Sequence, residues 1–198
     1  FYSEWTPLLT SDEVPINPYR VITDLIKSVD VSNTIITHDS GYPRDQLVPF
    51  WPSITPRSYI GWGKSTQLGY GLGLAMGAKL ADPEKTVFVF SGDGAFGFHI
   101  MEFDTAVRYN IPVVAIVGND SRWNAEHVLQ MKHYGENRTI GCELLPSRYD
   151  KIVQSLGGFG TSVDKLEDLE AALRDAIDSK LPACVNVSIE GRAAPVFS

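Results

Sequence analysis

The stretch that decides the fold is TVFVFSGDG, residues 86–94, an apolar run that ends in an acid between two glycines. A run rich in β-branched and aromatic residues predicts a strand buried on both faces. The glycines allow the backbone to turn tightly at the carboxyl end of that strand, and a helical pattern follows from about His99 to Tyr109. We therefore expect a strand, a turn and a helix, with Asp93 directed into a crevice.

A second apolar run, residues 112–118, ends in Asn119 and Asp120. A right-handed crossover brings the carboxyl ends of two parallel strands to one edge of a sheet, so Asp93 and Asp120 are expected to meet there. Two carboxylates that face one point need a cation, and Mg²⁺ is usually held by one or two carboxylates together with substrate phosphates. The pattern predicts a doubly wound α/β fold, with a mainly parallel sheet and helices on both faces, that binds a metal-bound diphosphate.

Composition narrows the class of protein further. With 198 residues and 43% hydrophobic content, the chain can bury one sizeable core, which predicts a single domain. A net charge of −7 without long acidic runs argues against a nucleic-acid surface, and no apolar stretch reaches the roughly 20 residues of a membrane helix. Cys142 and Cys184 lack the spacing of a metal site, so we expect reduced thiols, a cytoplasmic protein, and neither nucleic acid nor membrane as a partner.

The spacing from Gly92-Asp93-Gly94 to Asn119-Asp120 resembles the thiamin diphosphate (ThDP) motif, and the glycine-rich stretch 66–80 resembles the segment that precedes it in acetolactate synthases and their relatives. The resemblance covers nearly the whole chain. It implies the C-terminal, diphosphate-binding domain of a ThDP- and Mg²⁺-dependent enzyme with three domains. The missing N-terminal pyrimidine-binding and middle domains would be its partners, in a homodimer or homotetramer.

The resemblance also implies a role for individual residues. Asp93, Asp120 and the backbone oxygen of Arg122 would hold the metal, with Asn119 as the alternative to Asp120. The resemblance assigns further cofactor contacts to Gly41, Tyr42, Thr66, Leu68, Gly92, Gly94 and Ala95. Of these, the Thr66 carbonyl and the Leu68 amide would bind the aminopyrimidine, and the Leu68 side chain would support the bent form of ThDP. An ordinary turn at Gly41 and Tyr42, and a purely core role for Leu68, stay open.

Residues 122–130 predict a helix that enters beside the metal, and in the resembled family this region faces the substrate. Trp123, Asn124 and His127 are therefore candidates for the substrate pocket. An ordinary amphipathic helix without a role in substrate binding accounts for the same sequence equally well. We predict no catalytic residue in this chain, because the glutamate that activates the cofactor comes from another domain in this family. Residues 1–14 read as an interdomain linker, residues 15–190 as the ThDP-binding domain and residues 191–198 as a tail.

Two departures from the family pattern concern the reaction. Asp120 stands where the family usually has asparagine, which places a second negative charge near an anionic diphosphate. Trp123-Asn124-Ala125 stands where acetolactate synthases typically carry a Gly-Met pair. The predicted activity is therefore the shared step, cleavage or formation of a carbon–carbon bond next to a carbonyl, with a small 2-oxoacid, aldehyde or acyl-CoA as substrate. The alternatives are a non-catalytic ThDP-binding subunit and a generic nucleotide-binding module.

Overall fold

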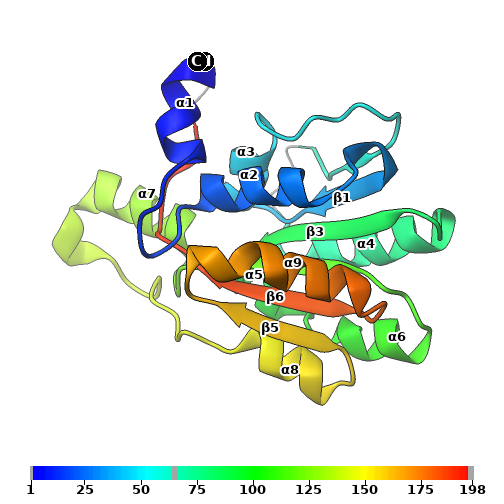
Figure 1. Cartoon of the computed structure of the whole chain (residues 1–198). Helices are drawn as coiled ribbons and strands as arrows, with labels where there is room; N and C mark the ends of the chain where they lie inside the picture. Colours follow the sequence, from blue (N-terminus) through cyan, green and yellow to red (C-terminus); the bar gives the residue numbers. More distant parts are fainter. Residues whose placement is uncertain (1, 64–66, 196–198) are drawn as a thin grey trace.

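The computed structural model describes residues 2–63 and 67–195, and its centre is a parallel sheet (Figure 1). The sheet has six strands in the order β2-β1-β3-β4-β6-β5, and every neighbouring pair is parallel. The strands are β1 (Thr34–His38), β2 (Tyr59–Ile60), β3 (Thr86–Gly92), β4 (Val114–Asn119), β5 (Phe159–Val163) and β6 (Ala183–Ser188). The chain runs outward from β1 to β2 and then returns to β3 on the other side of β1, so the winding reverses between β1 and β3.

Helices cover both faces of the sheet, as predicted (Figure 1). The α-helices are α1 (Tyr2–Leu9), α2 (Pro18–Ser28), α3 (Tyr42–Leu47), α4 (Tyr70–Ala81), α5 (Asp93–His99), α6 (Glu102–Arg108), α7 (Asn124–Tyr134), α8 (Tyr149–Ser155) and α9 (Leu169–Asp178). The described residues also form three short 3₁₀ turns, η1 (Val31–Asn33), η2 (Glu136–Arg138) and η3 (Leu166–Asp168).

Two apolar cores follow from the alternation of side chains along the strands. Phe88 and Phe90 of β3 point into the core formed with α2, α3 and α9, whereas Val87 and Val89 point into the core formed with α4, α5, α6 and α8. β3 is therefore apolar on both faces, which is why its sequence reads as a continuous apolar run rather than an alternating one.

Several elements differ from the sequence-based expectation. The segment expected as a linker contains helix α1, whose Trp5 and Leu8 pack against the core, and the loop expected after β1 contains α3. Two helices, α5 and α6, stand where a single helix was expected from about residue 99. The first of them, α5, begins at Asp93 itself. Glycines at helix positions lower the local helix propensity, which hid α5 from a reading based on apolar spacing.

The two ends of the described chain are tied to each other. Asn17 caps α2, since its side chain accepts a hydrogen bond from the Tyr19 amide. The Tyr19 hydroxyl donates to the Ala193 carbonyl at 3.0 Å, and Arg192 forms a two-pronged ion pair with Glu13. The segment after β6 is therefore anchored on the domain. In the parts of the chain that the structure describes, no helix combines the length and apolarity needed to span a membrane.

Candidate functional site

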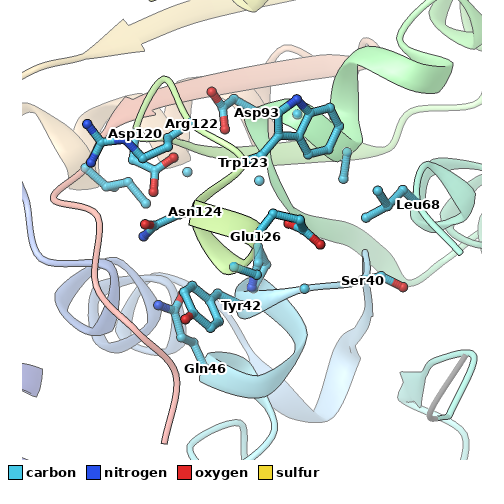
Figure 2. Close-up of a pocket in the computed structure, with 18 of the residues that line it drawn as sticks. Ser40, Tyr42, Gln46, Leu68, Asp93, Asp120, Arg122, Trp123, Asn124 and Glu126 are labelled. Atoms are coloured by element: carbon cyan, nitrogen blue, oxygen red, sulfur yellow. The ribbon is translucent and has the colours of Figure 1, made fainter. Parts of the chain in front are cut away.

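A cavity lies where the winding of the sheet reverses, at the carboxyl ends of β1, β3 and β4 (Figure 2). Parallel α/β sheets bind ligands at this position because loops and helix N-termini diverge there. The loop after β1, the glycine turn after β3, the end of β4 and the first turn of α7 all contribute to its wall. Leu68 lies on the wall between β1 and α4, and Arg192 approaches from the C-terminal segment.

Asp93 and Asp120 lie together at this edge because their strands are paired in register. Gly92 of β3 pairs with Gly118 of β4, and the two carboxylates follow directly beyond that pair. Burial raises the pKa of Asp93 to about 6, although nearby backbone N–H groups oppose the shift. Burial, together with the charge of Asp93, raises the pKa of Asp120 to about 7. The two side chains therefore repel each other when both are ionised, and a cation between them would relieve the repulsion.

The donor set fits a hard divalent cation. One carboxylate oxygen of Asp93, Oδ2, is buried and has no hydrogen-bond partner among the described residues. In the described ranges, no three His, Cys, Asp or Glu side chains lie close enough together to hold one metal ion. The acidic side chains at this edge can therefore supply two metal ligands, Asp93 and Asp120. Two carboxylates leave ligand positions for a backbone oxygen, for water and for a phosphate, which is the arrangement that Mg²⁺ prefers.

Asn119, the alternative metal ligand, is engaged elsewhere. Its Nδ2 donates to the Ser147 carbonyl at 3.0 Å and to Asn186 Oδ1 at 3.2 Å, while its Oδ1 accepts from the Ser121 amide at 3.1 Å. These bonds fix the end of β4 to β6 and to the loop before α8. Because Asn119 is absent from the cavity wall and Asp120 is on it, the geometry favours Asp120 as the ligand.

Asp39 holds two parts of the wall together, and the sequence analysis did not single it out. The side chain is only 2% exposed, and Oδ1 accepts from the amides of Ser40 and Gly69, each at 2.8 Å. Oδ2 accepts from the Gly71 amide at 3.1 Å, at the start of α4. The loop after β1 and the turn that carries Leu68 are therefore joined through one carboxylate. An acid just after a strand was the available signal, but two of its three partners, the amides of Gly69 and Gly71, lie 30 and 32 positions away in sequence.

Two glycines are required by the shape of the wall. Gly69 caps α4 with φ +85°, a left-handed conformation that other residues rarely adopt. At Gly94, an added Cβ would lie 2.7 Å from the indole ring of Trp123. The glycine turn after β3 and the start of α7 are therefore in direct contact, and the absence of a side chain at Gly94 permits that contact.

The cavity brings together most of the residues predicted for the site. Those on its wall are Gly41, Tyr42, Leu68, Gly92, Asp93, Gly94, Ala95, Asp120, Arg122, Trp123 and Asn124. His127 is not on the wall, because it begins the second turn of α7, and its Nε2 lies 3.7 Å from Glu143 Oε1. Thr66 lies outside the described residues. The wall also includes residues that the sequence analysis did not name, among them Ser40, Gln46, Glu126 and Arg192.

Comparison with known proteins identifies the domain. Residues 39–187 match the model of the family described as "Thiamine pyrophosphate enzyme, C-terminal TPP binding domain". The matched range begins just after β1, and it contains the loop that follows β1 and the ends of β3 and β4 that form the cavity. The chain belongs to this family. Thiamine pyrophosphate (TPP) is another name for ThDP, so the resemblance stated from the sequence is confirmed at the level of the family and of its doubly wound fold.

The relatives of this TPP-binding domain are longer proteins. The chain is 38% identical over 180 residues to the acetolactate synthase large subunit IlvG of Mycobacterium tuberculosis, covering 90% of the chain and 32% of that protein. It is 36% identical to 2-hydroxyacyl-CoA lyase 2 of Bos taurus, covering 88% of the chain and 28% of that protein. It is 32% identical to a sulfoacetaldehyde acetyltransferase of Alcaligenes xylosoxydans, covering 84% and 27%. The chain thus spans about a third or less of each of these relatives.

Proposed function

We propose that this TPP-binding domain holds ThDP through Mg²⁺, as part of an enzyme that cleaves or forms a carbon–carbon bond next to a carbonyl. The observation that carries the proposal is the pair Asp93 and Asp120, two carboxylates on one cavity wall with raised pKa values and one buried oxygen without a partner. Such a pair is unfavourable without a cation, and a diphosphate at the same edge supplies the remaining ligands of that cation.

Different residues of the chain bind different parts of the cofactor in this proposal. Asp93, Asp120 and the backbone oxygen of Arg122 hold the metal in this proposal, and the glycine turn at residues 92–95 leaves room for the diphosphate. Leu68 supports the bent cofactor from the opposite side, at a position fixed by Asp39. When bound, ThDP stabilises the electron pair left on a carbonyl carbon after a neighbouring bond breaks. The cavity wall orients the reacting groups and limits the access of water.

The complete activity requires more than this chain. Relatives that carry the domain are roughly three times longer, which supports a native enzyme with additional domains and with its activating glutamate outside this chain. The proposed substrates are a small 2-oxoacid, an aldehyde or an acyl-CoA, in keeping with the names of the acetolactate synthase and 2-hydroxyacyl-CoA lyase relatives. A homodimeric or homotetrameric assembly belongs to the same proposal.

The test is calorimetric titration of ThDP into the full-length protein with Mg²⁺, with EDTA, and with the variant Asp93→Ala. We expect binding in Mg²⁺ that is lost in EDTA and in Asp93→Ala, while Asp164→Ala, which removes an exposed acid outside the cavity, binds normally. Binding that survives both EDTA and Asp93→Ala would refute the metal-bridged site. Tighter binding of ADP than of ThDP would instead support a generic nucleotide-binding module. Metal-dependent ThDP binding in a protein that turns over no carbonyl substrate would indicate a non-catalytic subunit.

A further inference from the structure

Glu126 is an acidic residue on the cavity wall for which the metal site has no use. It lies in the first turn of α7, next to Trp123 and Asn124, and its side chain is exposed in this chain. Figure 2 shows its carboxylate directed across the cavity toward the side on which Leu68 lies. Among the described residues it forms neither a hydrogen bond nor an ion pair. Its charge is therefore free to act on whatever occupies the space in front of α7.

The positive charges on the same wall are already neutralised from outside the cavity. Arg122 forms a two-pronged contact with Glu143, at 3.0 and 3.1 Å, and Glu143, which supplies both acceptor oxygens, does not lie on the wall. Arg192 forms a second two-pronged ion pair, with Glu13, at 2.8 and 2.7 Å. Both guanidinium groups are thus paired with other acids, and neither forms an ion pair with Glu126.

The remaining groups around Glu126 are negative or neutral. Asp93 and Asp120 lie deeper in the cavity, where the metal would take up their charge. Tyr42, on α3, is close enough to Glu126 to feel its charge. The pKa of the Tyr42 phenol is raised, mainly by burial and to a smaller extent by the negative charges of Glu126 and Asp45. The Asn124 amide, whose Nδ2 is buried and without a partner among the described residues, lies on the Asp120 side of the cavity, away from the Glu126 carboxylate (Figure 2). The wall at α7 thus offers hydrogen-bonding groups and one uncompensated negative charge.

We infer that Glu126 is a specificity-determining residue, which selects an uncharged carbonyl compound such as an aldehyde over a 2-oxoacid anion at the α7 wall. This inference rests on the proposed function and narrows its substrate class. A carboxylate of the substrate placed beside Glu126 would be repelled, whereas a neutral carbonyl group would not be repelled and a hydroxyl group can donate a hydrogen bond to Glu126. Two like charges in a partly enclosed site of this kind discriminate on the order of tenfold.

The test compares two probes of nearly identical shape, oxamate, which is anionic, and oxamide, which is neutral. Each is titrated into the full-length protein loaded with ThDP and Mg²⁺, and affinities are measured for the wild type, for Glu126→Gln and for Glu136→Gln. Glu136 is an exposed acid in η2 and is absent from the cavity wall, so it is the matched control for the loss of one charge. The affinity for ThDP itself is measured first in all three proteins.

We expect Glu126→Gln to tighten oxamate binding about tenfold at low salt, with oxamide changed less than twofold and with Glu136→Gln unchanged. The gain should shrink in 0.5 M salt, because the side chain is exposed and its charge is screened. An equal response of both probes, or weaker oxamate binding in Glu126→Gln, would overturn the inference while normal ThDP binding leaves the proposed function intact. Failure of the wild type to bind ThDP in Mg²⁺ would overturn both.

Discussion

The two sides of the cavity are built in opposite ways. The strand wall, defined as residues 39–43, 67–71, 92–95 and 118–120, is held by buried backbone and by the hydrogen bonds of Asp39 and Asn119. The helix wall, defined as residues 123–126 at the start of α7, belongs to a helix without a single buried residue in its described length. The wall proposed to hold the cofactor is thus fixed by this domain alone, whereas the wall proposed to face the substrate is supported weakly.

The largest effect should follow from breaking the strand wall at Asp39. In Asp39→Ala the amides of Ser40, Gly69 and Gly71 lose a buried charged acceptor, and each unsatisfied group costs about 1–3 kcal/mol. We expect hydrogen exchange at residues 67–71 of the full-length protein to accelerate at least 100-fold, with loss of ThDP binding. Exchange is measured by mass spectrometry.

Asp39→Asn sharpens this test. The amide oxygen of asparagine can replace Oδ1, but its NH₂ group would face the Gly71 amide, so an intermediate acceleration is expected. Glu84→Ala, an exposed acid outside the cavity, is the control and should exchange like the wild type. If Asp39→Ala exchanged no faster than this control, the carboxylate would not be what joins the two segments.

The second effect concerns the charge pair within the strand wall. The folded pKa values of Asp93 and Asp120 are about 6 and about 7, whereas an unfolded aspartate titrates near about 3.9. A carboxyl group with a raised folded pKa costs stability above its unfolded pKa, so metal-free protein should lose stability as the pH rises from about 4 to about 7. At about 1.36 kcal/mol per pKa unit, the combined loss should be on the order of 7 kcal/mol.

The measurement is the melting temperature against pH in EDTA and in Mg²⁺. Mg²⁺ should raise the melting temperature at pH 7.5 and have little effect at pH 4.5, where both groups are protonated. Asp120→Asn should flatten the EDTA profile, while Asp164→Asn should leave its slope unchanged. The same slope in Asp120→Asn and in the wild type would mean that the two carboxylates do not share one cation site.

The contact between the two walls can be disturbed at Gly94. A Cβ at this position would lie 2.7 Å from the Trp123 ring, so Gly94→Ala should displace the indole and reduce ThDP affinity about tenfold, a loss of about 1.4 kcal/mol. Gly97→Ala, on the same helix, meets its nearest neighbours at 3.8 Å and should bind ThDP as the wild type does. Tryptophan fluorescence and calorimetry report the two effects. Equal affinities in the two variants would show that the walls are not coupled through this contact.

The strand wall was also the part that could be predicted from sequence. A buried parallel strand requires an apolar run, and the turn after it requires glycine. Both features are visible in the short segments before and around Asp93 and before Asp120. The parallel sheet, the edge that carries the site and the pair of carboxylates could therefore be predicted from these segments. Asp39 was missed because its role depends on amides some 30 residues away, and Glu126 was missed because helical spacing alone does not reveal which residues of a first turn face a cavity. Short helices such as α1 and α3 were hidden by their prolines and by their length.

The smallest effect is expected at His127, on the second turn of α7. The His127 side chain contacts Glu143, whose side chain is 65% exposed. Ion pairs with an exposed partner contribute about 0–1 kcal/mol to the free energy of unfolding. His127→Gln should therefore change ThDP affinity and kcat/KM less than twofold, whereas Glu126→Gln, one residue earlier, changes the preference between anionic and neutral ligands. A tenfold fall in kcat/KM for His127→Gln would place this side chain at the substrate. The helix wall would then include the second turn of α7, which would require α7 to be rotated in the full-length enzyme that we propose.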